Sequence, residues 1–158
     1  RRQERLMSAC VFCEIAAGTS PAAKVYEDEH CLAFMDIHPI RPGHLLVIPR
    51  GHAEQLLELP QATRDHLFRV GQRLMNAIRH SALDSDAFNL AMNDGRAAGQ
   101  SVPHVHLHIL PRRRGDMLAT LRGLLLHFTG LFGRAVAHER LEQQAAVIRD
   151  ALTAVEAR

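Results

Sequence analysis

The feature that most constrains this chain is the alternating segment His104-Val105-His106-Leu107-His108-Ile109-Leu110. Side chains of a β-strand point to opposite faces with a period of two, so the three histidines share one face and the aliphatic residues share the other. The aliphatic face predicts packing against a core. The histidine face requires polar partners, because buried imidazoles need hydrogen bonds. The segment therefore predicts a strand with one chemically active face.

The residues alone leave three interpretations of that face open. It could be an exposed polar face, although surface strands favour Thr, Lys and Glu. It could chelate a metal ion. It could also act in nucleophilic and acid–base catalysis, with one imidazole attacking while its neighbours orient it. The loop Gly95–Ser101 lies just upstream and could bind a phosphate through its backbone N–H groups, with Gln100 and Ser101 as side-chain donors. This neighbourhood favours phosphoryl chemistry.

The order of the predicted elements indicates an α+β fold with a mainly antiparallel sheet. Apolar residues at three- and four-residue steps predict one long amphipathic helix over Ala62–Ser81, and a C-terminal helix runs from Leu141 to Val155. A short helix is expected over Val11–Ala17, while Arg112–Gly133 shows no clear pattern. The predicted strands are Lys24–Glu27, Cys31–Asp36, Leu45–Ile48, Ala87–Met92 and His104–Leu110.

Length and composition exclude several classes. The 158 residues predict a single domain over residues 7–158, with residues 1–6 as an extension ahead of Met7. A net charge of +2 and the lack of a basic helix interleaved with aromatics argue against nucleic-acid binding. The longest apolar runs are far shorter than the ~20 residues that span a bilayer, so no membrane partner is expected. Three cysteines without a regular framework indicate a reducing compartment, and we expect a cytoplasmic protein.

The histidine segment matches the pattern His-φ-His-φ-His-φ-φ, where φ is apolar, at every position. The chain thereby resembles the histidine triad (HIT) superfamily of nucleotidyl hydrolases and transferases, and Gly99-Gln100-Ser101-Val102 is similar to its Hint branch. The resemblance runs from Cys10 to about Asp116 and includes Tyr26–Asp28, Leu32–Ile37 and Gly43–His52. It does not cover residues 117–158. It implies a HIT-like fold.

The resemblance also implies roles for the triad. His106 would be the nucleophile that attacks the α-phosphorus and forms a nucleotidyl-histidine intermediate, which water then hydrolyses. His108, Asn93, Gln100 and Ser101 would bind the α-phosphate, with Ser101 near the leaving group and counted among the catalytic residues. A neutral imidazole is a competent nucleophile near pH 7, and fixed donors can stabilise the phosphoryl oxygens.

A second implied group would hold the nucleoside. Phe12, Ile15, Phe34 and Ile37 match positions that sandwich a purine base, and Asp36 matches the carboxylate that binds the ribose hydroxyls. From the residues alone, the four apolar side chains would be core and Asp36 a turn residue. His44 occupies a matching position in a supporting role. Five other histidines are expected to be ordinary surface or boundary residues: His30, His66, His80, His127 and His138.

Cys10-Val11-Phe12-Cys13 has a spacing that suits zinc binding, thiol–disulfide exchange or two buried thiols. The resemblance supplies two further ligands, His52 and His104, as in some bacterial members. Such a closed Cys₂His₂ set would hold a structural zinc ion. His104 would then serve the metal and leave His106 and His108 for catalysis.

The predicted activity is hydrolysis of purine nucleotides substituted at the α-phosphate, of the nucleoside 5′-phosphoramidate type. One alternative is a dinucleoside polyphosphate hydrolase of Fhit type, because Leu110-Pro111-Arg112 and Gly115-Asp116 resemble that branch. Others are a metal-dependent hydrolase that uses the co-facial histidines and a nucleotide-binding protein without catalysis. The metal-dependent alternative is disfavoured because no acidic residue lies within or just after the triad.

We also expect a homodimer. The predicted helices leave more apolar strand surface than one layer can cover, and open sheet edges need pairing. Hint-type relatives pair their sheets across a twofold axis, which is the commonest symmetric arrangement. The segment after Met117 could add to that interface or pack within its own chain.

Overall fold

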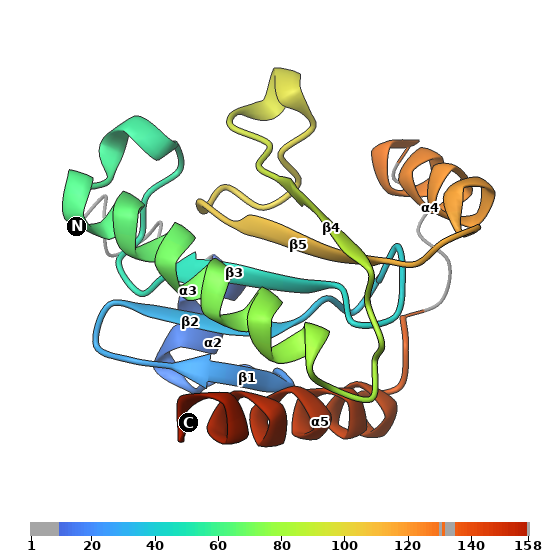
Figure 1. Cartoon of the computed structure of the whole chain (residues 1–158). Helices are drawn as coiled ribbons and strands as arrows, with labels where there is room; N and C mark the ends of the chain where they lie inside the picture. Colours follow the sequence, from blue (N-terminus) through green and yellow to red (C-terminus); the bar gives the residue numbers. More distant parts are fainter. Residues whose placement is uncertain (1–9, 130, 132–134, 158) are drawn as a thin grey trace.

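The computed structural model describes residues 10–129, 131 and 135–157, and it confirms the α+β fold (Figure 1). Five strands form one antiparallel sheet in the order β1-β2-β3-β5-β4. The strands are β1 Lys24–Glu27, β2 Cys31–Met35, β3 Leu45–Pro49, β4 Ala87–Ala91 and β5 Leu107–Arg112. The helices are α2 Val11–Ala17, α3 Gln61–Arg79, α4 Met117–Thr129 and α5 His138–Glu156, with short 3₁₀ turns η1 Leu56–Glu58 and η2 Arg96–Ala98. The predicted extension over residues 1–6 lies outside the described residues.

Helices α3 and α5 cover one face of the sheet and form the main core with it. Leu67 of α3, Ile148 of α5 and the alternate β5 residues Leu107 and Ile109 are buried there. Gly71 allows the close approach of α3, since a Cβ at this position would lie 3.3 Å from Leu107 Cδ2 and 3.4 Å from Ile109 Cδ1. The aliphatic face predicted for the histidine segment thus packs on the core.

The opposite face carries a smaller apolar cluster under α2, which lies behind the sheet in Figure 1. Phe12 and Ile15 of α2 pack there on Phe34 of β2 and Leu46 of β3. Helix α2 ends at Gly18, whose φ of 77° is the left-handed conformation that glycine adopts without strain. His108 of β5 and His106 just before it lie on this second face, because they alternate with the core residues Leu107 and Ile109.

The strand was predicted over His104–Leu110, but β5 begins three residues later, at Leu107, and ends two residues later, at Arg112. Pairing with β3 stops at Val47–Leu107, and β3 ends shortly after at Pro49, which has no N–H to donate. The Pro49 carbonyl instead accepts a hydrogen bond from the His104 ring, at 2.9 Å. At the other end, Pro111 is tolerated because β5 there pairs only with β4.

The C-terminal helix was predicted correctly, and its residues Leu141, Ala145, Ile148 and Leu152 are buried. The stretch without a clear pattern forms α4, which extends beyond the end of the sheet near β5 (Figure 1). No helix of the described residues is long and apolar enough to cross a membrane.

Candidate active site

Hydrogen bonding fixes the protonation of the His106 ring. Its Nδ1 lies 2.7 Å from the backbone carbonyl oxygen of His104, and a carbonyl can only accept, so Nδ1 carries the proton. Nε2 therefore keeps a lone pair. Burial lowers the pKa of His106, which favours the neutral ring at pH 7. Nε2 of His106 is thus chemically able to act as a nucleophile, and that role stays a prediction.

The adjacent His108 has the opposite tautomer, because His44 sets it. The backbone N–H of Ile40 donates to His44 Nδ1 at 3.1 Å, which leaves the His44 proton on Nε2. That Nε2 lies 3.0 Å from His108 Nδ1, so His108 accepts there and carries its own proton on Nε2. Burial lowers the pKa of His44 to about 4 and that of His108 to about 2. His108 is therefore a neutral hydrogen-bond donor, and its ring centroid lies 4.9 Å from that of His106.

Asp36 is a turn residue whose carboxylate also lies beside the triad. One carboxylate oxygen accepts the backbone N–H of His38 at 2.8 Å, as in an Asx turn. The other oxygen lies 3.6 Å from His44 Nε2. The side chain is buried beside the triad, and its contact with ribose stays a prediction.

Of the four residues predicted to hold the base, Phe12, Ile15 and Phe34 are buried in the second-face cluster and Ile37 is 54% exposed. Phe12 packs edge-on against Phe34, with ring centroids 5.4 Å apart. The same ring lies 5.3 Å from His106. Phe12 therefore connects this cluster to His106, while a base sandwiched by these residues stays a prediction.

The loop residues predicted to bind phosphate are engaged in different ways. Gln100 uses both ends of its amide within the protein: Oε1 accepts the Gly95 N–H at 2.8 Å, and Nε2 donates to the Glu54 carbonyl at 2.7 Å. It thus shapes the loop. Ser101 is exposed, and the Asn93 amide donates to Gly99 at 3.4 Å. Their contacts with an α-phosphate stay predictions.

A cavity of about 440 Å³ lies beside the triad and is lined by His44, Asn93 and His108 together with residues of β4, β5 and α4. It also brings in His127 of α4, whose ring centroid lies 5.6 Å from that of His108. The sequence analysis placed His127 among ordinary histidines. No local signal could have found it, because α4 lacks a strong apolar periodicity and His127 meets His108 only in space.

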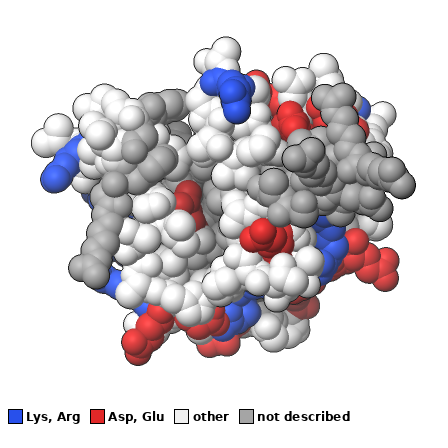
Figure 2. Space-filling model, turned by 180° about the vertical axis from the view of Figure 1, so that it is seen from behind, with Lys and Arg blue, Asp and Glu red and all other residues white. Residues whose placement is uncertain are grey.

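Lys and Arg side chains lie toward the margins of the α2 side of the molecule, and the visible surface between them is mostly uncharged or acidic (Figure 2). This distribution agrees with the interpretation that a small number of directed donors, rather than a basic surface, would hold a phosphate here.

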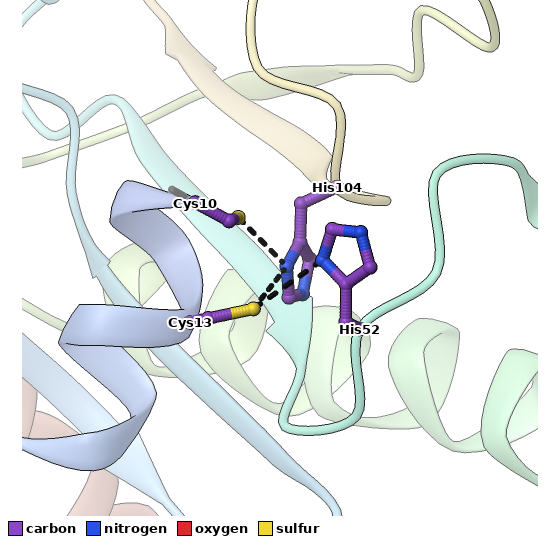
Figure 3. A group of neighbouring side chains, drawn as sticks. All are labelled: Cys10, Cys13, His52 and His104. Atoms are coloured by element: carbon purple, nitrogen blue, oxygen red, sulfur yellow. Dashed lines mark hydrogen bonds between the residues drawn. The ribbon is translucent and has the colours of Figure 1, made fainter. Parts of the chain in front are cut away.

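Cys10, Cys13, His52 and His104 form a second cluster next to the triad (Figure 3). They come from the start of α2, the turn after β3 and the segment before β5. Their ligand atoms all lie within 4.8 Å of one another. Cys13 Sγ lies 3.3 Å from His52 Nδ1, and His104 Nδ1 lies 3.5 Å from the sulfur of each cysteine. The sequence-predicted ligand set is thus brought together.

These distances fit a tetrahedral ion. With Zn–S near 2.3 Å and Zn–N near 2.0–2.1 Å, a sulfur and a nitrogen ligand lie about 3.5 Å apart. The His104 Nε2–H donates to the Pro49 carbonyl, which leaves Nδ1 free of a proton and aimed at the cysteines. Burial lowers the pKa of His104 to about 4, so this ring is neutral, as a ligand must be.

Comparison with known proteins agrees with this geometry. The family model described as the HIT domain matches residues 17–115. An uncharacterized HIT-like protein of Mycobacterium tuberculosis is 44% identical over 144 residues, covering 89% of this chain and 99% of the relative. An adenylylsulfatase of Arabidopsis thaliana is 42% identical, covering 77% of this chain and 61% of that protein. An adenosine 5′-monophosphoramidase of Saccharomyces cerevisiae is 35% identical, covering 68% and 65%.

Among solved structures, a zinc-bound histidine triad family protein from Mycobacterium smegmatis superposes with a TM-score of 0.80 at 38% identity. The match covers 96% of this chain and 98% of that one. The family-model match, the relatives and the shared fold establish one conclusion: this chain is a member of the HIT family.

Proposed function

We propose that this protein hydrolyses purine nucleotides substituted at the α-phosphate, of the nucleoside 5′-phosphoramidate type, through a nucleotidyl-His106 intermediate. The observation that carries the proposal is the pair of opposite tautomers in adjacent rings. His106 presents an unprotonated Nε2, and His108 presents a protonated one. A nucleophile and a phosphate-binding donor thereby lie side by side.

The reaction follows from these two nitrogens. His106 Nε2 attacks the α-phosphorus and forms a P–N bond, while the amine leaves with the electrons of the original P–N bond and takes up a proton. His108 Nε2–H donates to a phosphoryl oxygen on which charge develops. Water then attacks the phosphorus, the bond to His106 breaks with its electrons returning to Nε2, and the nucleoside monophosphate is released. The water gives up one proton to solvent, which balances the proton that the amine took up. In this proposal Ser101 and Asn93 add donors, and Phe12, Ile15, Phe34, Asp36 and Ile37 hold the nucleoside.

The relatives named adenylylsulfatase and adenosine 5′-monophosphoramidase support this class of substrate. The Fhit-type alternative has less support, because Arg112 does not offer a free cation. Its guanidinium is paired with Asp116 at 2.7 Å and donates to Asn89 at 2.6 Å. The metal-dependent alternative is weakened because His104 faces the cysteines rather than the cavity.

We expect His106→Ala to lower kcat by at least about a thousand-fold and to leave AMP affinity within a few-fold, because it removes the attacking atom and little of the nucleoside site. Steady-state kinetics with adenosine 5′-phosphoramidate and calorimetric titration with AMP measure the two effects. Wild-type protein quenched during turnover should carry an acid-labile, base-stable nucleotide adduct at His106.

The matched control is His138→Ala, which alters an exposed histidine at the start of α5 and should keep wild-type kcat. If His106→Ala retained most of its activity, the mechanism would be wrong. A dinucleoside polyphosphate cleaved with the higher kcat/KM would instead favour the Fhit-type alternative.

We propose that Cys10, Cys13, His52 and His104 hold a structural zinc ion. The ion would supply a cross-link between α2 and the segments that follow β3 and precede β5. Because Phe12 lies between the two cysteines and His106 follows His104 by two residues, this link would position both. Burial raises the pKa of the Cys13 thiol to about 12, so binding must displace its proton.

Elemental analysis should find close to one zinc per chain, and Cys13→Ala should lose it. Zinc at 1,000 times its dissociation constant stabilises a fold by about 4 kcal/mol, so chelation should lower the unfolding free energy by an amount of this order. Cys31→Ala is the control, since this buried thiol lies in the main core. Full stability of the metal-free protein, with free Cys10 and Cys13 thiols, would contradict the assignment.

We propose that the protein is a homodimer. Strand β4 is at a sheet edge and largely exposed, and Leu118, Leu121 and Leu125 of α4 are also exposed. Pairing would cover this apolar surface. Sedimentation equilibrium at micromolar concentration should give twice the 17.6 kDa chain mass. A single species at the monomer mass would refute the dimer.

A further inference from the structure

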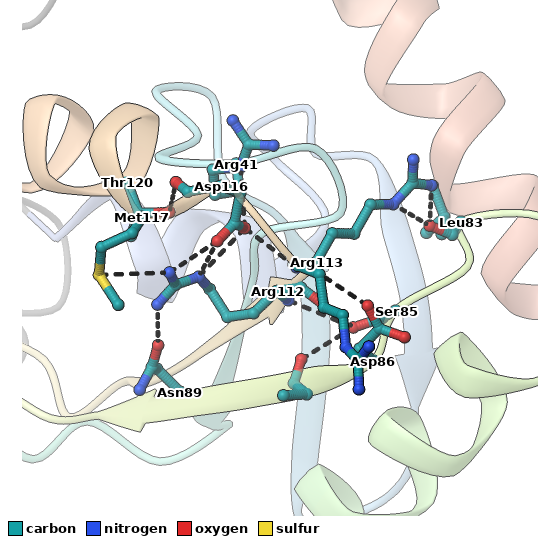
Figure 4. A network of polar contacts seen from close by, with 12 residues as sticks. Arg41, Leu83, Ser85, Asp86, Asn89, Arg112, Arg113, Asp116, Met117 and Thr120 are labelled. Carbon is teal, nitrogen blue, oxygen red and sulfur yellow. Dashed lines mark hydrogen bonds and ion pairs between the residues drawn. The ribbon is translucent and has the colours of Figure 1, made fainter.

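Helix α4 is anchored at its start by a network of charged side chains (Figure 4). Asp116 directly precedes the helix, and its carbonyl accepts the Thr120 N–H at 2.9 Å. Its carboxylate receives Arg112 through Nε and Nη2 at 2.7–3.1 Å, and Arg41 Nε lies 3.4 Å away. The Arg112 side chain draws the pKa of Asp116 down to about 2, so the carboxylate is charged at neutral pH. This network joins α4 to β5 and to the segment before β3.

A second contact fixes the direction of the helix. A Cβ on Gly123 would lie 2.9 Å from Ile40 Cγ2 and 3.0 Å from the Ile40 carbonyl oxygen. Only glycine allows α4 to approach this backbone so closely. Ile40 is also the residue whose N–H orients His44, so the helix is seated against the same segment that sets the tautomers of the triad. Two anchor points, Asp116 and Gly123, thus define where the rest of α4 lies.

The anchored helix forms one wall of the cavity beside His108. Leu124, Met117 and His127 of α4 face Leu90 and Ala91 of β4 across it. His44, Asn93 and His108 line the cavity on the side of the triad, and most of its other lining residues are apolar. No acidic residue is among its described lining residues, and its cation Arg112 is already paired with Asp116.

We propose that this cavity receives the leaving group of the substrate, an organic amine of apolar character, and that His127 donates a hydrogen bond to the atom that leaves the α-phosphorus. The inference rests on the proposed function. Phe12 and Ile15, which would contact the base, belong to the cluster under α2, whereas the cavity opens from His108 and Asn93 toward α4. A phosphate held at His108 would therefore direct its substituent into the cavity.

The position of His127 suits this role. A ligand-type nitrogen of His127 and one of His108 lie within 4.8 Å of each other. Donors at this separation can reach two atoms bonded to one phosphorus, so His108 can hold a phosphoryl oxygen while His127 contacts the atom that leaves. His127 is also less buried than the three buried imidazoles His44, His106 and His108.

The lining also selects the class of leaving group. An apolar amine would gain from burial of its carbon surface against Leu90 and Leu124. A polyphosphate chain would bring several negative charges into a cavity whose guanidinium is neutralised by Asp116. The cavity therefore favours an apolar substituent over an anionic one.

The test compares adenosine 5′-phosphoramidate, which releases ammonia, with its N-phenethyl derivative. We expect Leu124→Trp, which fills the cavity, to lower the ratio of kcat/KM for the phenethyl over the unsubstituted substrate at least ten-fold, within the range for steric discrimination in apolar pockets. The matched control is Leu126→Trp, at a neighbouring leucine that is 37% exposed, lies outside the lining and is not among the leucines assigned to the dimer surface. It should keep the wild-type ratio within two-fold.

His127 is tested with both substrates. His127→Ala should lower kcat/KM about ten-fold for each, which is the size expected for one hydrogen bond made near the reacting atom. His127→Gln retains a donor and should recover part of the loss. An effect below two-fold in His127→Ala, or equal ratios for Leu124→Trp and Leu126→Trp, would overturn the inference while leaving the proposed function standing.

Binding separates this inference from the proposed function. In the inactive His106→Ala background, Leu124→Trp should weaken binding of the phenethyl phosphoramidate at least ten-fold more than binding of AMP, as measured by calorimetry. If the wild-type protein cleaved neither phosphoramidate, the proposed function would fail. The binding difference would still decide whether the cavity accepts the amine.

If Leu124→Trp does not fold, Leu90→Trp fills the cavity from β4 and is used in its place. Equal weakening of phenethyl phosphoramidate binding and AMP binding would overturn the inference.

Discussion

The arrangement of the site depends on the hydrogen bond from the His104 ring to the Pro49 carbonyl. This bond ends the pairing of β3 with the segment that leads into β5 and turns His104 Nδ1 toward Cys10 and Cys13. It also leaves the His104 carbonyl available to His106 Nδ1. One side-chain-to-backbone contact therefore shapes the cluster of Cys10, Cys13, His52 and His104 and also orients the His106 ring.

Burial determines the charge of the three imidazoles that lie side by side here. His44, His106 and His108 are taken out of water, which penalises their charged forms and keeps them neutral. Neutral rings have one donor and one acceptor each, so a backbone N–H at Ile40 and a backbone carbonyl at His104 are enough to define where every proton lies. Exposed histidines would exchange tautomers and lose this distinction.

Much of the fold and part of the site could be predicted from the sequence, because these features are local or carried by a motif. The long helix, the C-terminal helix and the strands were found within a few residues. The start of β5 was placed three residues early, since the competing contact comes from Pro49, 55 positions away in the chain. The ligand set Cys10, Cys13, His52 and His104 followed from the family resemblance, and the structure brings it together.

The sequence by itself determined which residues of the histidine segment share a face, because the period of a strand is two and needs no partner to be read. It determined the family through the same segment. Only the tertiary structure decided that the Gln100 amide hydrogen-bonds to the backbone of Gly95 and Glu54, that Arg112 pairs with Asp116, and that α4 brings His127 to the cavity. These facts are contacts between segments with no shared local pattern. Packing decides such contacts, so they become visible only when the chain is folded.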